Sequence, residues 1–336
     1  MKNVFLFRVD GGKVWGVSSG HINRCLLVAR ALPDDCNPVF LMKNYPEGVN
    51  FVKSKGIMLE TIELGDDQDE TVINLCEEYK PNKIIVDLFV DPYRFLYEYA
   101  RKNKISTIVF DVSGKHFSVP DILINDSLVK EFTAYPHLDL GTRKYIGPDY
   151  FIMGNAPRVI PIDDQVKEIM VTIGGSDPAG ITMKVIQVLT RGRALPYKVN
   201  VVLGPFFTEY KEICNLIGDN RGFIIHYNPK NFLELLSRQD IVITSAGRTL
   251  YESAYLGRPV VIVPSIEHEA KVAEEYAART GAFNIGMFND FASSDKIIDA
   301  LAIYLRESGL RRSVFKSSRA LVDGRGLERV MDIVNF

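Results

Sequence analysis

The segments Lys83-Ile84-Ile85-Val86-Asp87 and Pro259-Val260-Val261-Ile262-Val263 are continuous apolar runs near the middle of each half of the chain. Strands without alternation of polar and apolar residues are typical of parallel sheets that helices cover on both faces. Similar short β-branched runs, such as 3–9 and 106–110, alternate with helical patterns along most of the sequence. These repeated strand–helix units predict a doubly wound α/β protein.

The same criteria locate the other elements. Ile22, Cys25, Leu26 and Ala29 follow the i, i+3, i+4, i+7 spacing of one buried helical face, which predicts a helix over 21–32. The segments predicted as strands are 3–9, 37–42, 57–61, 83–87, 106–110, 121–125, 168–173, 198–203, 222–226, 240–243, 259–263 and 282–286.

The series of units is interrupted at about 150–166, where turn residues such as Gly154-Asn155-Ala156-Pro157 gather. A new strand then opens a second series. We therefore expect an N-terminal Rossmann-like domain over 1–158 and a C-terminal Rossmann-like, nucleotide-binding domain over 166–320. Residues 321–336 are expected to form a C-terminal helix that packs back on the N-terminal domain. Two such domains predict a ligand cleft between them.

Composition limits the classes of function. The 336 residues are 46% hydrophobic and 24% charged, and 40 Lys+Arg against 42 Asp+Glu give a net charge of −2. This balance excludes a disordered chain and gives no basic field for a nucleic acid. No apolar run reaches the roughly 18–20 residues that span a bilayer. The charged residues near the start exclude a signal peptide, and the four scattered cysteines fit a reducing compartment. We expect a cytoplasmic protein without a membrane segment.

The first motif is the loop after the first strand, Gly11-Gly12-Lys13-Val14-Trp15-Gly16-Val17-Ser18-Ser19-Gly20-His21-Ile22-Asn23-Arg24-Cys25. In doubly wound sheets ligands bind at the carboxyl ends of strands, where such loops meet helix N-termini. Ser19 and Gly20 lie where first-turn amides can bind an anion, and His21 is a candidate general base. The alternative is an ordinary capped helix start with a surface histidine.

The second motif, Gly174-Gly175-Ser176-Asp177-Pro178, follows the strand at 168–173 and precedes a helix expected to start at Pro178 or Ala179. Glycine amides and a helix dipole form a cradle for a phosphate or diphosphate. The alternative is a strand-to-helix turn that Asp177 caps. No Walker lysine is present, which disfavours an ATPase.

The third motif, Ser245-Ala246-Gly247-Arg248-Thr249-Leu250-Tyr251-Glu252, leads from the strand at 240–243 into a helix. Gly247, Arg248 and Thr249 lie where they can contact phosphate, and Glu252 can accept hydrogen bonds from a ribose diol. The alternative for Glu252 is an acid that only complements the helix dipole.

Further polar groups follow other strands. Asp87 and Asp111 end strands of the first half and either bind sugar hydroxyls or cap helices. Glu267-His268-Glu269 is interpreted as a polar loop that contacts a sugar or base, because its spacing does not fit a metal shell. The other histidines are expected to be structural: His116, His137 and His226.

Taken together, the G-H-x-x-R-C loop, the G-G-S-D-P turn and S-A-G-R-T-L-Y-E-S-A-x-L-G-R-P resemble a known family over most of the chain, from Arg8 to about Gly286. The family is that of the UDP-sugar hydrolases of pseudaminic acid biosynthesis and the related spore-coat-polysaccharide proteins. Its members have the GT-B fold and are distant relatives of the lipid-linked GlcNAc transferase of peptidoglycan synthesis.

The resemblance implies hydrolysis of the sugar C–O bond of UDP-2,4-diacetamido-2,4,6-trideoxy-β-L-altropyranose, with inversion and release of UDP. It implies that His21 is the base for the attacking water, that no metal or other cofactor is required, and that Glu252 binds the ribose. The implied diphosphate turn is Gly174, Gly175 and Ser176. The substrate-binding residues expected in all are Ser19, Gly20, Arg24, Asp87, Asp111, Gly174, Gly175, Ser176, Gly247, Arg248, Thr249, Glu252, Glu267 and His268.

Three other functions stay open on the sequence. An inverting GT-B glycosyltransferase would pass the sugar to an acceptor in place of water. A nonhydrolysing sugar 2-epimerase would use a similar fold with different loop chemistry. A non-catalytic nucleotide-sugar-binding module would need no base, so the presence of His21 argues against it.

Overall fold

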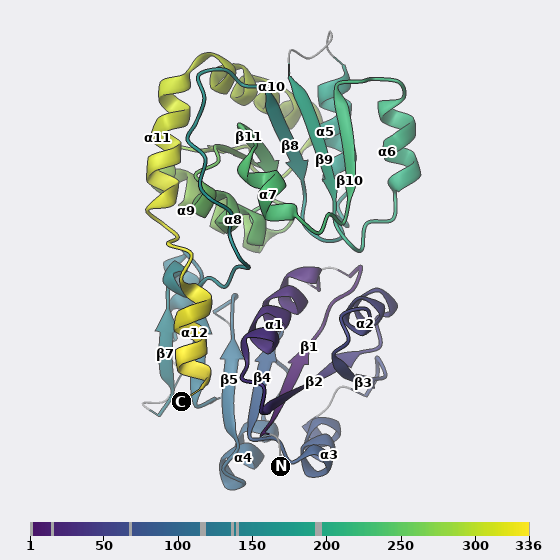
Figure 1. The fold of residues 1–336 in the computed structure, drawn as a ribbon, viewed down its shortest axis with the longest axis vertical. Helices are drawn as coiled ribbons and strands as arrows, with labels where there is room; N and C mark the ends of the chain where they lie inside the picture. The colour runs from purple at the N-terminus through teal and green to yellow at the C-terminus, as the bar shows by residue number, and fades with distance from the viewer. Residues whose placement is uncertain are drawn as a thin grey trace. The chain divides into compact units, whose positions relative to one another are not determined.

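The computed structural model describes residues 3–14, 17–66, 69–114, 119–135, 138, 141–191 and 197–335. The chain divides into two compact units, the first made of Met1–Gly154 with Arg325–Phe336 and the second of Asn155–Gly324. Each unit is built on one parallel sheet with helices packed beside it (Figure 1). The expected doubly wound α/β architecture is therefore confirmed.

The sheet of the first unit has seven strands in the order β3-β2-β1-β4-β5-β6-β7, and all their pairings are parallel. Strand order reverses between β1 and β4, which are neighbours in the sheet although two strands separate them in sequence. Such a reversal is the place where doubly wound sheets bind ligands. The strands are β1 Asn3–Val9, β2 Cys36–Lys43, β3 Met58–Ile62, β4 Lys83–Asp87, β5 Ser106–Phe110, β6 Ile122–Asn125 and β7 Arg143–Ile146.

Helices complete this unit, and its last one comes from the end of the chain. The α12 helix packs against α1 and the 3₁₀ turn η2. A Cβ at Gly326 would lie 2.1 Å from the Phe151 carbonyl oxygen, so glycine allows this close approach. The helices are α1 Ser19–Ala31, α2 Pro46–Lys53, α3 Asp69–Tyr79, α4 Phe95–Lys102 and α12 Gly326–Val334, with the 3₁₀ turns η1 Lys130–Thr133 and η2 Pro148–Tyr150.

The sheet of the second unit has the order β10-β9-β8-β11-β12-β13, again with parallel pairings, and it reverses between β8 and β11. Its strands are β8 Glu168–Thr172, β9 Lys198–Leu203, β10 Phe223–Tyr227, β11 Ile241–Thr244, β12 Val260–Ile262 and β13 Phe283–Asn284. Its helices are α5 Ile181–Thr190, α6 Tyr210–Ile217, α7 Phe232–Ser237, α8 Arg248–Leu256, α9 Glu267–Thr280, α10 Asp290–Arg306 and α11 Ser308–Arg319.

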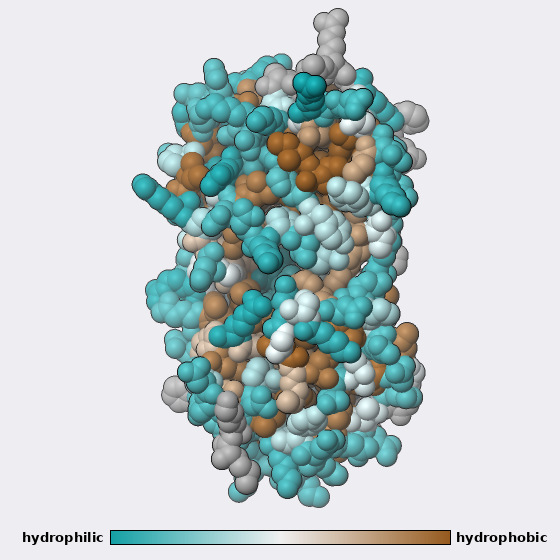
Figure 2. Space-filling view, turned by 45° about the vertical axis from the view of Figure 1, so that its right-hand side comes forward, coloured by the Kyte–Doolittle hydropathy of each residue, from teal (hydrophilic) through white to brown (hydrophobic). Residues whose placement is uncertain are grey.

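Most residues of the central strands are buried in both units. The β4 residues from Ile84 to Asp87 and the whole of β11 are buried, as continuous apolar runs predict. On the face shown in Figure 2, apolar residues form separate patches among hydrophilic ones. None of the described helices is both long enough and apolar enough to cross a membrane.

Candidate active site

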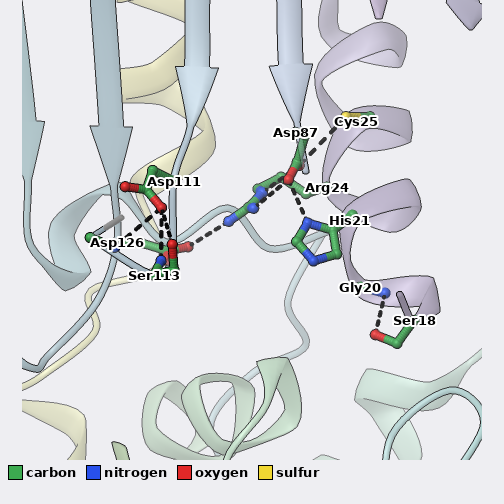
Figure 3. A network of polar contacts seen from close by, with 10 residues as sticks. Ser18, Gly20, His21, Arg24, Cys25, Asp87, Asp111, Ser113 and Asp126 are labelled. Carbon is green, nitrogen blue, oxygen red and sulfur yellow. Dashed lines mark hydrogen bonds and ion pairs between the residues drawn. The ribbon is translucent and has the colours of Figure 1, made fainter. Parts of the chain in front are cut away.

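The reversal point of the first sheet holds a histidine–aspartate pair. Asp87 is the last residue of β4 and fully buried, and His21 lies in the first turn of α1, the helix that follows β1. The Nδ1 atom of His21 is 2.6 Å from Oδ1 of Asp87 (Figure 3). The two residues are 66 positions apart in sequence, and the parallel pairing of β1 with β4 brings them together.

Arg24 and Cys25 approach the same carboxylate from the same helix. Arg24 donates to Asp87 through Nε at 2.7 Å and Nη2 at 2.6 Å, and the Cys25 thiol lies 3.6 Å from Oδ2. Residues three and four positions after His21 share its helical face. The G-H-x-x-R-C motif therefore places an imidazole, a guanidinium and a thiol around one buried carboxylate, as Figure 3 shows.

The charge on Asp87 determines which nitrogen of His21 carries the proton. Burial alone would raise the pKa of Asp87, but the Arg24 charge and hydrogen bonds from Arg24 and His21 hold that pKa well below its usual range. An ionised carboxylate only accepts hydrogen bonds, so the proton of the shared bond lies on Nδ1. The Nε2 atom of a neutral imidazole then has a lone pair to receive a proton.

The Nε2 atom of His21 is also accessible. The side chain is 13% exposed, and in Figure 3 the second ring nitrogen points away from Asp87. Within the described part of the chain, no side chain hydrogen-bonds to Nε2. An oriented imidazole with an open nitrogen is the arrangement of a general base.

The acids after the next two strands have different roles. Asp111 accepts hydrogen bonds from the Ser113 amide and hydroxyl at 2.8 and 3.0 Å and from Tyr135 at 2.9 Å. These contacts use both of its oxygens, which hold the bend after β5 and bind the Tyr135 hydroxyl within the unit. Asp126, which follows β6, lies 3.4 Å from Nη1 of Arg24 and was missed from the sequence. Asp126 directly follows an apolar strand, and Asp87 ends one, so the same pattern could have identified Asp126 as a candidate.

The helix start at α1 is capped from within. Ser18 is its N-cap, and the Ser18 hydroxyl accepts from the Gly20 amide at 3.3 Å. Ser19 is buried, whereas Gly20 is half-buried beside it. A Cβ at Gly48 would lie 1.9 Å from the Gly11 carbonyl oxygen, so α2 supports the start of this loop closely. The predicted loop residues Trp15 and Gly16 lie outside the described residues.

The second motif is a capped turn. Both oxygens of Asp177 accept from α5 amides, that of Ile181 at 2.9 Å and that of Thr182 at 2.7 Å. The helix begins at Ile181, later than the expected Pro178 or Ala179, because its N-cap, Gly180, lies in the left-handed region with φ 63°. Ser176 is buried, and two first-turn amides of α5 are occupied by a carboxylate. The helix dipole here is complemented by Asp177, whereas Gly174 and Gly175 keep part of their surface exposed.

The third motif differs from the second at this point. The N-cap of α8 is Gly247, which has no side chain with which to cap the helix. The three residues of the predicted phosphate site, Gly247, Arg248 and Thr249, are all partly exposed. A helix start at a partly exposed glycine, with an arginine in its first turn, is suited to a phosphate group.

Glu252 follows one turn later on α8. Burial raises the pKa of Glu252, and the nearby Arg248 charge opposes that rise. The residue as a whole is half-buried, and its contact with a ribose stays a prediction.

The segment predicted as a polar loop at 267–269 is instead the first turn of α9, so that expectation was wrong. Two glutamates in the first turn stabilise a helix start, which explains why the segment is helical. Glu267 is exposed and His268 half-buried. Glu269 accepts from the Ser265 amide at 2.8 Å, and its other oxygen would lie 3.4 Å from a Cβ at Gly247. Glu269, which we did not predict as a site residue, therefore lies beside the start of α8.

Neither the other histidines nor the acidic residues of the described chain form a candidate metal site. His226 lies 2.9 Å from the Asn200 amide oxygen and has a structural partner. His116 and His137 lie outside the described residues. Among the described side chains, no three His, Cys, Asp or Glu residues are grouped closely enough to hold a metal ion.

Two doubly wound parallel sheets in one chain, each with a reversal point, form the architecture of the GT-B proteins. Comparison with solved structures supports this class: the chain superimposes on MurG of Acinetobacter baumannii with a TM-score of 0.64 at 14% identity, over 100% of this chain and 99% of that one. The spinosyn rhamnosyltransferase SpnG complexed with thymidine diphosphate gives 0.65 at 14% identity, over 98% and 100%. A UDP-GlcNAc 2-epimerase of Neisseria meningitidis bound to UDP-GlcNAc gives 0.62 at 10%, over 100% of both chains. The GT-B fold class expected from the sequence is confirmed.

Sequence relatives are more specific. The chain is 24% identical over 331 residues to the spore coat polysaccharide biosynthesis protein SpsG of Bacillus subtilis (strain 168), over 97% of this chain and 96% of that protein. It is 27% identical over 289 residues to the uncharacterized protein MJ1062 of Methanocaldococcus jannaschii, covering 80% of this chain but 57% of that protein. No family model matches the sequence. The predicted relation to spore-coat-polysaccharide proteins is confirmed, whereas the relation to the pseudaminic acid hydrolases stays a prediction.

Proposed function

We propose that this protein is an inverting glycosyltransferase of polysaccharide biosynthesis that takes its sugar from a nucleotide sugar. The observation that carries the proposal is the His21–Asp87 pair at the reversal point of the first sheet, with Nε2 of His21 open. The similarity to a spore coat polysaccharide biosynthesis protein and the rhamnosyltransferase among the structural neighbours support the reaction class.

In the proposed reaction, a hydroxyl group of the acceptor gives its proton to Nε2 of His21 while its oxygen attacks the anomeric carbon of the sugar. The bond between that carbon and the diphosphate oxygen breaks, and its electron pair leaves with the nucleoside diphosphate. Asp87 holds the imidazole in the required tautomer and stabilises the imidazolium that forms. Attack opposite to the leaving group inverts the anomeric centre.

The second unit is proposed to bind the nucleotide. The start of α8 and Arg248 would receive the diphosphate, where helix amides and the arginine stabilise the charge of the leaving group. Glu252 would accept hydrogen bonds from the ribose hydroxyls. We propose UDP as the nucleotide, since a UDP-sugar is bound to one structural neighbour.

Hydrolysis of a UDP-linked diacetamido-trideoxyhexose is the second candidate function. It is favoured by one observation, the convergence of His21, Arg24 and Cys25 of the G-H-x-x-R-C motif on Asp87. The base and the leaving group would be the same, and water would replace the acceptor hydroxyl.

One experiment separates the two functions. The full-length protein is incubated with a panel of UDP- and dTDP-sugars in buffer without acceptor, then with an extract of polyols and glycans added, and nucleoside diphosphate release is followed by ³¹P NMR. Release that needs the acceptor supports the transferase, and stoichiometric release in water supports the hydrolase. Binding of nucleotide without release in either condition would contradict both.

A further inference from the structure

The Asp87 carboxylate is shared between two nitrogen donors, the imidazole of His21 and the guanidinium of Arg24. Its Oδ1 atom accepts from both His21 Nδ1 and Arg24 Nη2, each at 2.6 Å. Its Oδ2 atom accepts from Arg24 Nε at 2.7 Å. A histidine–aspartate pair needs only the first of these contacts, so the bidentate arginine is an additional feature of this site.

The position of Arg24 is tightly determined. The residue is 5% exposed, and its guanidinium carbon lies 5.0 Å from the centre of the Phe110 ring. Its remaining nitrogen, Nη1, is 3.4 Å from Asp126 Oδ2. The arginine therefore has one aromatic and two carboxylate partners, and it cannot turn away from Asp87 without losing all three.

We propose that Arg24 is a positioning residue that controls the protonation of His21 through the carboxylate they share. Before reaction the group His21⁰–Asp87⁻–Arg24⁺ is neutral, and protonation of His21 gives it one net positive charge. Without Arg24, the same protonation would turn a net negative pair into a neutral ion pair. The positive charge of Arg24 on the shared carboxylate therefore opposes formation of the imidazolium.

The other charged groups around His21 are consistent with this role. On its own helix the facing groups are Arg24 and the Cys25 thiol, and Asp87 faces it from the end of β4. Asp126, which follows β6, contacts the Arg24 guanidinium and therefore affects the charge near His21 through Arg24. Asp111, after β5, is held by Ser113 and Tyr135 instead. Arg24 is thus the cation that offsets Asp87 in this group.

The test measures the charge of His21 directly. In full-length protein labelled with ¹⁵N-histidine, the His21 ring signals are assigned by their loss in His21→Ala and followed from about pH 5 to 9. In Arg24→Gln we expect the titration midpoint of His21 to move upward by about 1 to 2 pH units relative to wild type. Arg24→Lys, which keeps the charge, should lie between the two.

Two further variants keep the test decisive. Arg8 is a buried arginine of β1 that binds Asp10 at 2.6 and 2.8 Å, so Arg8→Gln is the matched control and should leave the His21 midpoint unchanged. Should Arg24→Gln fail to fold, Asp126→Asn removes a negative charge near Arg24 and should move the midpoint downward by roughly a few tenths of a pH unit. If neither Arg24→Gln nor Asp126→Asn moves the His21 midpoint, the proposal is overturned.

The role of Arg24 in catalysis rests on the proposed function. Failure of the proposed function and failure of the coupling between Arg24 and His21 give different results. If the protein turns over nucleotide sugars, the acid limb of the pH–rate profile should move to higher pH in Arg24→Gln and follow the NMR midpoint. If no nucleotide sugar is turned over but the midpoint moves as stated, the proposed function fails while the coupling between Arg24 and His21 is supported.

Discussion

The two sheets reverse strand order in the same way, yet the groups at their reversal points differ. At the first sheet, polar side chains meet: His21 and Arg24 both bind the buried carboxylate of Asp87. At the second sheet, the segment after β11 is Ser245-Ala246-Gly247, and the N-cap of α8 is a glycine. The first arrangement suits the transfer of a proton, and the second suits the binding of an anion.

Two turns of the second unit also differ in how they begin the next helix. The turn after β8 and the turn after β11 are both rich in glycine and serine, and both lead into a helix. Asp177 accepts two hydrogen bonds from α5 amides, whereas the N-cap of α8 is Gly247, which has no side chain. Similar sequence chemistry therefore gives one helix start held by its own aspartate and one that begins at a partly exposed glycine followed by Arg248.

The largest expected effect is that of Asp87→Asn. An amide cannot hold both the Nδ1–H tautomer and the Arg24 charge, so turnover of the nucleotide sugar should fall by about 10²- to 10⁴-fold. Asp10→Asn is the matched control, because Asp10 also binds a buried arginine, Arg8, without touching His21. Steady-state kinetics with circular dichroism of both variants checks this. An equal loss of turnover in Asp10→Asn would mean that the effect is structural.

The next effect concerns the proposed nucleotide site at α8 and the capped turn before α5. Glu252→Gln should weaken nucleoside diphosphate binding about tenfold, because a charged acceptor for the ribose is lost. Asp177→Ala should instead lower the free energy of unfolding by about 1 to 2 kcal/mol, since it removes the cap of α5, and leave the affinity unchanged. Isothermal titration and urea unfolding measure the two quantities. Weaker nucleotide binding in Asp177→Ala, with unchanged binding in Glu252→Gln, would indicate a nucleotide site at α5 instead.

The smallest expected effect is that of Glu269→Gln. Its carboxylate lies beside Gly247 at the start of α8, where it would compete with the proposed diphosphate for the positive end of the helix. Removing its charge should strengthen nucleotide binding about threefold at roughly pH 8. The control is Glu275→Gln, on the exposed side of the same helix. Weaker binding in Glu269→Gln would show that the carboxylate contacts the substrate favourably.

The same variant has a pH-dependent effect on stability. Burial raises the pKa of Glu269 above its ordinary value of 4.5. The stability that the protonated group contributes is fully present below that ordinary value and is lost as the pH rises through the folded value. Glu269→Gln should therefore be more stable than wild type at neutral pH, and the difference should vanish below about pH 4.5 in urea unfolding experiments.

Most of the fold followed from the sequence because its strands are continuous apolar runs. The predicted strands at 3–9, 83–87, 106–110 and 198–203 have the observed bounds. The strand β7 was missed because its residues Arg143–Ile146 are largely exposed at the sheet edge and begin with two cations. Edge strands of this kind lack the hydrophobic signal that identifies a buried strand.

The candidate site was predictable residue by residue but not as a set of contacts. His21, Arg24 and Asp87 were each expected to bind substrate or act on it, yet no sequence rule pairs residues 66 positions apart. The structure joins them through the adjacency of β1 and β4. Glu269 was missed because the acidic segment was interpreted as a loop, although two glutamates at a helix start are a capping signal.

The most direct test of the account compares two histidine variants of the full-length protein. In His21→Ala, isothermal titration should show nucleoside diphosphate binding within about twofold of wild type, while turnover of the nucleotide sugar falls by about 10³-fold. His226→Gln, which alters a histidine bound to Asn200, should change neither quantity. Turnover in His21→Ala within a few-fold of wild type would contradict the assignment of His21 as the base.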